Sequence, residues 1–276
     1  MKHLRDSQAP TPSFGPMPYS GTLTVPLVHL LVSTCIVLGI ALLVFIAWFP
    51  EPLGELAGGS KLFWIVVAVD VVCGPFLTWL LYSPKKSRVA LTIDISLVVF
   101  IQVAALAYGI YSLRISRPIA LVYEVDRFRL LSVADIPEAE VAKAPSWVRH
   151  WGGSNVRVLG IRSATNLDEK LDSVNGALQG VEPSQRPDWW QDYALSIPSV
   201  LKRARPLEEL RQKHPTRLEV LNKAVERAIG EVRQGETTDS TQLLWLPLVG
   251  RRSLEWVVLL DPATARPRGY VELDGF

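Results

Sequence analysis

Three long apolar segments in the first half of the chain constrain its fold more than any other feature of the sequence. They run over residues 27–49, 62–82 and 89–113. At about 1.5 Å of rise per residue, a helix over the first segment is roughly 34 Å long, enough to cross a bilayer. This segment is too long for the apolar core of a signal peptide, and Trp48-Phe49-Pro50 does not resemble a cleavage site built from small residues. The pattern predicts a bundle of three transmembrane helices.

The regions outside these segments predict the remaining domain organisation. Residues 1–26 contain five prolines, which predicts a disordered tail. Residues 114–276 are long enough for one soluble domain. The whole chain has a net charge of +2, so the basic face of a nucleic-acid-binding domain is not expected. Both cysteines, Cys35 and Cys73, lie in apolar segments, which leaves the soluble domain without a disulfide framework or a cysteine zinc site.

The charges of the short connectors predict how the chain is oriented. The second connector, 83–88, has Lys85, Lys86 and Arg88 and no acidic residue, whereas the first, 50–61, sets Lys61 against two glutamates. Cytoplasmic loops are enriched in Lys and Arg, so we expect the second connector and the N-terminus in the cytoplasm. The C-terminal domain is then expected outside the membrane, in the periplasm of a bacterium with two membranes.

Residues 114–276 predict an α+β domain with mainly antiparallel strands. Apolar or β-prone runs bounded by turn residues predict strands over 119–125, 128–133, 156–161, 243–249, 253–260 and 269–273. Apolar residues at helical spacing predict a helix over 216–229, and a shorter helix is expected over 166–176. A meander of antiparallel strands packed by helices is the simplest fold for this order of elements.

Asp70 is the most unusual residue of the membrane segments, because a carboxylate near the middle of a bilayer is costly and needs a partner. Counted from the predicted cytoplasmic ends, Asp70 lies about 18 Å deep and Gln102 about 20 Å deep. A hydrogen bond between the second and third helices is therefore expected. Two interpretations stand: a proton relay or a contact with another membrane segment, and a structural role in which a protonated Asp70 bonds Gln102 or a freed backbone carbonyl. A single acid makes a poor relay, which favours the structural role.

Gly74 and Pro75 follow Asp70 by one helical turn. Proline removes a backbone donor, so a kink is expected here, with a freed carbonyl near Val71. Asp94 lies close enough to the basic connector to reach its cations, and we expect it to act as a topological anchor.

The soluble region contains no recognisable catalytic or metal-binding motif. His150 and His214 have no metal-ligating neighbour at helical or hairpin spacing. No catalytic residue, metal site or cofactor is predicted. Trp189 and Trp190 indicate either a surface for a protein partner or the filling of a modest core.

Four ordered blocks of sequence, over 61–75, 83–86, 105–109 and 117–129, resemble the TfpX/TfpZ type IV pilin accessory proteins. The likeness covers roughly residues 60–136, and its most distinctive part is Val125-Asp126-Arg127-Phe128. Beyond Glu138 it is one of general layout. The residues that match the family pattern are Asp70, Pro75, Glu124, Asp126, Arg127 and Phe128.

This resemblance implies an accessory protein of type IV pilus biogenesis in the bacterial inner membrane. Such a protein is expected to assist or modulate assembly of a cognate major pilin by chaperone-like or regulatory contacts, without catalysis. The expected partners are that pilin, then pilus assembly machinery of the inner membrane, together with membrane lipid; nucleic acid is not expected. Two alternatives remain: a polytopic membrane enzyme or proton-coupled component that uses Asp70, and a periplasmic sensor.

Overall fold

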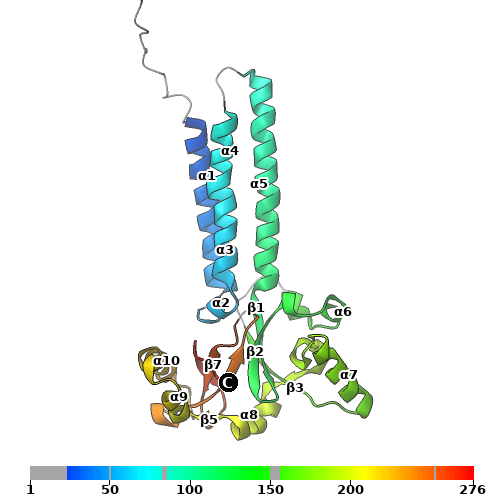
Figure 1. Cartoon of the computed structure of the whole chain (residues 1–276), viewed down its shortest axis with the longest axis vertical. Helices are drawn as coiled ribbons and strands as arrows, with labels where there is room; N and C mark the ends of the chain where they lie inside the picture. Colours follow the sequence, from blue (N-terminus) through cyan, green and yellow to red (C-terminus); the bar gives the residue numbers. More distant parts are fainter. Residues whose placement is uncertain (1–23, 50, 83–85, 150–155, 252) are drawn as a thin grey trace, which may run out of the picture.

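The computed structural model describes residues 24–49, 51–82, 86–149, 156–251 and 253–276. Three long helices stand on a domain of strands and shorter helices (Figure 1). Most of the tail predicted to be disordered lies outside the described residues, as do Lys85 of the basic connector and His150.

The described residues include three helices that are long and apolar enough to cross a membrane, over 24–48, 59–81 and 88–116, which confirms the prediction. The first is α1 (Thr24–Leu42), extended by a π-helical turn over Leu43–Trp48. The second joins α3 (Gly59–Val67) and α4 (Gly74–Leu81) through a π-helical turn over Ala68–Cys73. The third is α5 (Arg88–Ser116), whose first turn is capped by the Ser87 side chain.

The second membrane helix is the centre of the bundle. It packs against α1 on one side and against α5 on the other. Close approach to α5 depends on Gly109, where an added Cβ atom would lie only 2.6 Å from a methyl group of Val66. The end of the bundle nearest the soluble domain has its own apolar core, which includes Trp48, Phe63 and Leu113.

A short helix in the first connector, α2 (Leu53–Leu56), ties the bundle to the soluble domain. Leu53 and Leu56 are buried in the same apolar cluster as Leu121 and Leu248 of the sheet. Gly250 leaves room for this contact, since a Cβ atom there would lie 2.4 Å from Leu56 Cδ1. The connector is therefore part of the core of the soluble domain.

The soluble domain is built on one mixed sheet with the order β4-β3-β1-β2-β6-β7-β8, in which β5 also pairs with β6. The strands are β1 (Pro118–Glu124), β2 (Arg127–Ser132), β3 (Arg157–Ile161), β4 (Trp190–Asp192), β5 (Arg205–Pro206), β6 (Leu244–Val249), β7 (Trp256–Leu260) and β8 (Pro267–Val271).

The expectation of a mainly antiparallel sheet is wrong, because the sheet is mixed. The β1–β2 hairpin lies in the middle, with β3 parallel to β1 and β6 parallel to β2. Every residue of β1 is buried, as expected for a strand covered on both faces. Strand β2 itself returns the chain between the parallel strands β1 and β3. Strands β4 and β6 also run in the same direction, so the mainly helical segment between them returns the chain. An apolar run bounded by turn residues predicts a strand but not its neighbours.

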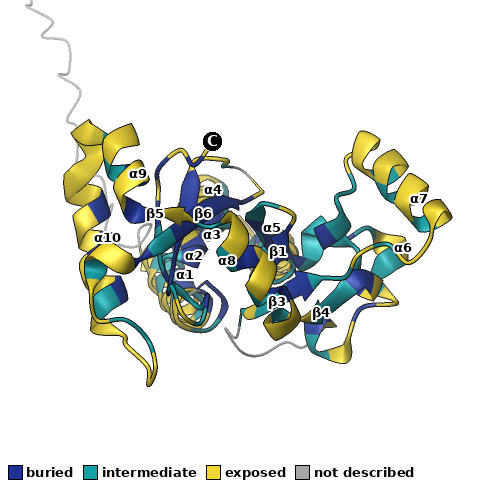
Figure 2. Cartoon of the chain, turned by 90° about the horizontal axis from the view of Figure 1, so that it is seen from below, coloured by how far each residue is buried: buried dark blue, intermediate teal, exposed yellow. Residues whose placement is uncertain are grey.

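The other helices of the soluble domain are α6 (Glu138–Val141), α7 (Leu167–Leu178), α8 (Ile197–Arg203), α9 (Leu207–Lys213) and α10 (Leu218–Gly230). Helix α10 packs on β8 and buries Leu221 and Val225. Helix α7, in contrast, has no buried residue, and Figure 2 shows it exposed along its length.

Candidate interaction sites

Asp70 lies in the π-helical turn of the second membrane helix, with 5% of its surface exposed. The side chain of Gln102 on α5 donates a hydrogen bond of 3.2 Å to the backbone carbonyl of Asp70. In a π-helix a carbonyl bonds the N–H five residues on, and here that residue is Pro75, which has no N–H. The carbonyl that Gln102 supports is thus that of Asp70, whereas the sequence had pointed to Val71.

The carboxylate of Asp70 is less well satisfied than its backbone. Among the described residues, Oδ2 of Asp70 and Oε1 of Gln102 are buried and have no hydrogen-bond partner. Gly74 makes this arrangement possible, since a Cβ atom there would lie 1.9 Å from Gln102 Nε2. The structure therefore brings together Asp70, Gly74, Pro75 and Gln102, with two buried acceptors that lack a donor.

Two other polar pairs lie nearer the end of the bundle remote from the soluble domain. Lys86 Nζ lies 2.6 Å from a carboxylate oxygen of Asp94, which is the contact expected for an anchor at the basic connector. His29 Nδ1 on α1 lies 2.6 Å from Thr78 Oγ1 on α4, a contact that sequence reasoning missed. Counting residues from the helix ends places His29 and Thr78 at similar depth, as it does Asp70 and Gln102. The sequence could therefore have predicted this contact.

Asp70 lies between two grooves on the surface of the bundle. The larger, of about 320 Å³, lies between α1 and α5 and has Asp70, Gln102, His29 and Thr78 among its lining residues. The smaller, of about 220 Å³, lies between the second helix and α5. Apart from these polar groups the larger groove is lined mostly by valine, isoleucine and leucine.

The residues of the distinctive sequence block form the tip of the β1–β2 hairpin. Val125 turns the chain with a φ of 55°, which is a strained conformation for a β-branched residue. Asp126 pairs with Arg127 at 2.8 Å, and Phe128 is fully buried. Burial raises the pKa of Glu124, and Arg129, at 3.6 Å, opposes that shift. These contacts give the block a structural part in the hairpin, and any contact with a partner remains a prediction.

The two tryptophans predicted as a partner surface are mostly covered. Trp189 is 3% exposed, and the guanidinium carbons of Arg162 and Arg186 lie 5.0 and 4.6 Å from the centre of its ring. Trp190 is half-buried, stacks on Trp147, and donates a hydrogen bond to a backbone carbonyl. Both rings therefore pack within the domain, and their role as a contact patch stays a prediction.

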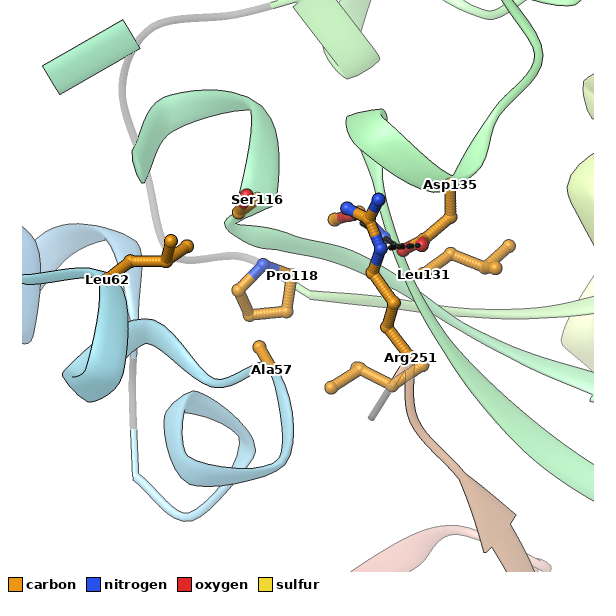
Figure 3. A pocket seen from close by; sticks show the side chains of 9 residues that line it. Ala57, Leu62, Ser116, Pro118, Leu131, Asp135 and Arg251 are labelled. Carbon is orange, nitrogen blue, oxygen red and sulfur yellow. Dashed lines mark hydrogen bonds and ion pairs between the residues drawn. The ribbon is translucent and has the colours of Figure 1, made fainter. Parts of the chain in front are cut away.

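The junction between bundle and sheet encloses a small cavity of about 20 Å³, room for about one water molecule. Ala57 lines it from the end of α2, Leu62 from the second membrane helix, and Pro118 from the sheet (Figure 3). Arg251 closes it with an ion pair to Asp135 at 3.4 Å. This cavity is too small for an organic ligand, so we assign it to the joint between the two parts.

Among the described residues, no three His, Cys, Asp or Glu side chains are grouped so that they could hold a metal ion. The polar groups of the bundle are arranged as hydrogen-bonding and contact sites between helices.

Residues 16–58 match the sequence profile of the family described as "Fimbrial assembly protein FimB". The chain is 34% identical over 249 residues to the fimbrial assembly protein of serogroup E1 from Dichelobacter nodosus, covering 90% of this chain and 94% of that protein. It has the same identity and coverage with the serogroup I protein of that organism. A third relative, of serogroups C1 and C2, is 40% identical over 117 residues, covering 42% of this chain and 89% of that protein.

No solved structure matches the chain significantly. The resemblance to the TfpX/TfpZ proteins is compatible with the fimbrial relatives, and the assignment to that family remains a prediction. Because two of these relatives align with the chain over nearly their whole length, the chain belongs to the FimB family of fimbrial assembly proteins.

Proposed function

We propose that this protein is a non-catalytic assembly factor of type IV fimbriae in the bacterial inner membrane. It assists or modulates assembly of a cognate major pilin through direct contacts, within the bilayer and on the periplasmic side. Its N-terminus lies in the cytoplasm and its soluble domain in the periplasm. Pilus assembly machinery of the inner membrane is a further partner.

The observation that carries this proposal is the near full-length similarity to fimbrial assembly proteins, on a chain that has three membrane helices and one soluble domain. A fimbrial subunit held in the membrane by an apolar helix has parts both in the bilayer and outside it. A protein of this layout has surfaces at both levels. The unsatisfied acceptors at Asp70 and Gln102 support a contact role for the bundle.

Deletion of the gene tests the proposal. We expect few or no surface fimbriae and loss of twitching, with recovery when the gene is supplied in trans. Electron microscopy counts the fimbriae, and immunoblotting of cell fractions shows whether the subunit accumulates in the membrane. Normal fimbriation in the deletion strain contradicts the proposal.

The buried carboxylate of Asp70 also supports a second candidate, a proton-coupled membrane component. Asp70→Asn separates the two, because asparagine keeps hydrogen-bonding capacity but does not titrate. We expect fimbriation close to that of the parent strain for Asp70→Asn. Loss of fimbriation with a normal amount of protein in the membrane would favour the proton-coupled function instead.

A further inference from the structure

The larger groove of the bundle has a shape into which another helix could pack. Its wall on α1 includes Val28, Val32 and Ile36, and its wall on α5 includes Val99 and Val103. The lining residues run over 25–36 on α1 and 95–106 on α5, about three turns of each helix. Residues four apart lie on one face of a helix, so these five side chains form a ridge along each wall. All five side chains are β-branched and stiff, which preserves the shape of the groove.

Two polar atoms of the groove lack a hydrogen-bond donor. Asp70 Oδ2 and Gln102 Oε1 are acceptors, both are buried, and neither has a hydrogen-bond partner among the described residues. Both residues line the groove. In hydrocarbon an unsatisfied polar group is strongly destabilising, because no water is present to bond it, so a groove of this kind favours an occupant that supplies a donor.

We propose that the groove between α1 and α5 binds one apolar membrane-spanning helix of another protein, and that this helix presents a hydrogen-bond donor to Asp70. Acyl chains fill an apolar groove but donate no hydrogen bond. A hydroxyl, amide or amine on the incoming helix satisfies the acceptors and fixes its depth. The proposal rests on the function given above, in that the fimbrial subunit is the expected owner of the helix.

Site-specific photo-crosslinking in living cells tests the proposal with a matched pair of positions. A benzophenone amino acid is placed at Val99, which lines the groove, or at Phe100, which is 71% exposed and does not line it. We expect an adduct at position 99 whose peptide, identified by mass spectrometry, belongs to the membrane-spanning helix of the fimbrial subunit. We expect at least ten-fold less at position 100. Equal amounts of adduct at the two positions overturn the proposal. It is also overturned if position 99 forms no adduct with the subunit and crosslinks instead to lipid, a second copy, this chain's own tail or another protein.

The donor requirement has its own test in the cells that carry the probe at position 99. Asp70→Leu removes the acceptor, and we expect at least a ten-fold loss of the adduct. Asp70→Asn keeps an acceptor oxygen, so most of the adduct should persist. Asp94→Asn is the control, because Asp94 pairs with Lys86 and does not line the groove. An adduct unchanged by Asp70→Leu overturns the donor requirement.

A second variant covers the case in which Asp70→Leu does not accumulate in the membrane. Val99→Trp fills the groove, and we expect several-fold fewer fimbriae at normal protein level, whereas Phe100→Trp leaves the count unchanged. Equal counts for the two tryptophan variants contradict the proposal. Failure of this inference is distinct from failure of the proposed function: fimbriae lost on gene deletion, without a subunit adduct at position 99, overturn the groove alone.

Discussion

At the scale of single residues, the soluble domain depends on a buried cluster of charges around Arg268. The Arg268 side chain is fully buried, donates to the carbonyls of Ala228 and Thr237, and lies 3.2 Å from Asp261. Burial by itself raises the pKa of Asp261, but backbone N–H donors, including those of Thr264 and Thr237, outweigh burial and hold that pKa below its ordinary value. The cluster links the end of α10 to the loops beside β7 and β8.

Arg268→Met is expected to destabilise the soluble domain by about 3–5 kcal/mol, because it leaves the buried carboxylate of Asp261 without its cation. Urea unfolding of the full chain in detergent micelles, followed by tryptophan fluorescence, measures the change. The matched control is Lys223→Met, whose ion pair with Glu219 is exposed and should change stability by at most about 1 kcal/mol. Equal effects of the two substitutions would contradict this assignment.

Glu236 gives the domain a defined response to acid. The hydrogen bonds from Arg266 lower the pKa of Glu236 from 4.5 to about 2. Since the folded pKa lies below the unfolded one, the stabilisation is complete above about pH 4.5 and is lost as the pH falls toward 2. The urea midpoint of Glu236→Gln should therefore depend less on pH in this window than that of the parent chain. Glu255→Gln, at an exposed position, serves as the control and should follow the parent.

The sequence identified the unusual polar residues of the membrane helices, but not the atoms through which they form hydrogen bonds. Matching depths brought Asp70 and Gln102 together, and the structure joins them through the backbone carbonyl of Asp70. That carbonyl is free because the helix widens to a π-helical turn before Pro75, and helix type at one turn is set by tertiary packing, which periodicity does not report. The fit of Gly74 against Gln102 likewise depends on where two separate helices cross.

At the scale of elements, two amphipathic helices of the soluble domain use their apolar faces in opposite ways. Helix α10 has Leu221 and Val225 buried against the sheet. Helix α7 has a stripe of apolar residues at helical spacing that is 53–82% exposed, made of Leu167, Leu171, Val174 and Leu178. No described residue covers that stripe. The sequence predicted both helices, that of α10 by its periodicity, but not which one packs, because a sequence pattern shows a face and not its neighbour.

A pair of leucine substitutions tests this difference. Leu221→Ala should cost about 2–5 kcal/mol of folding free energy, since it leaves a cavity between α10 and the sheet. Leu171→Ala should change the folding free energy by no more than about 0.5 kcal/mol, because Leu171 is 53% exposed. Urea unfolding midpoints of the full-length variants measure both. A large loss for Leu171→Ala would mean that α7 packs on the domain.

The arrangement of the sheet was the least predictable part of the fold. Six of the eight strands of the sheet were foreseen within a few residues, whereas the short strands β4 and β5 were missed. Strands β3 and β6 pair in parallel with the central hairpin, which was not predicted. Pairing between strands that are far apart in sequence depends on the path of the intervening helices. A run such as that of β1 is apolar at both even and odd positions, which fits a central strand, and the sequence does not say which neighbours it has.

At the scale of the whole molecule, the bundle and the sheet share a core through α2. Leu56 is 2% exposed and packs with residues of the sheet. We expect Leu56→Ser to raise amide hydrogen exchange over α2 and to lower the stability of the soluble domain by about 2–5 kcal/mol, through lost packing. Hydrogen exchange with mass spectrometry on the full chain in nanodiscs measures this. Leu254→Ser, at a position that is 60% exposed, should leave exchange over α2 unchanged.

The third membrane helix passes into the sheet with one residue, Arg117, between the end of α5 at Ser116 and the start of β1 at Pro118. With so short a joint, and with α2 as a second attachment, a rotation of α5 about the membrane normal carries the sheet with it. Helix α7 lies away from the axis of α5 (Figure 1), so a small rotation of α5 in the bilayer displaces α7 along an arc outside the bilayer. The short joint therefore couples the position of α7 outside the bilayer to the rotation of α5 within it.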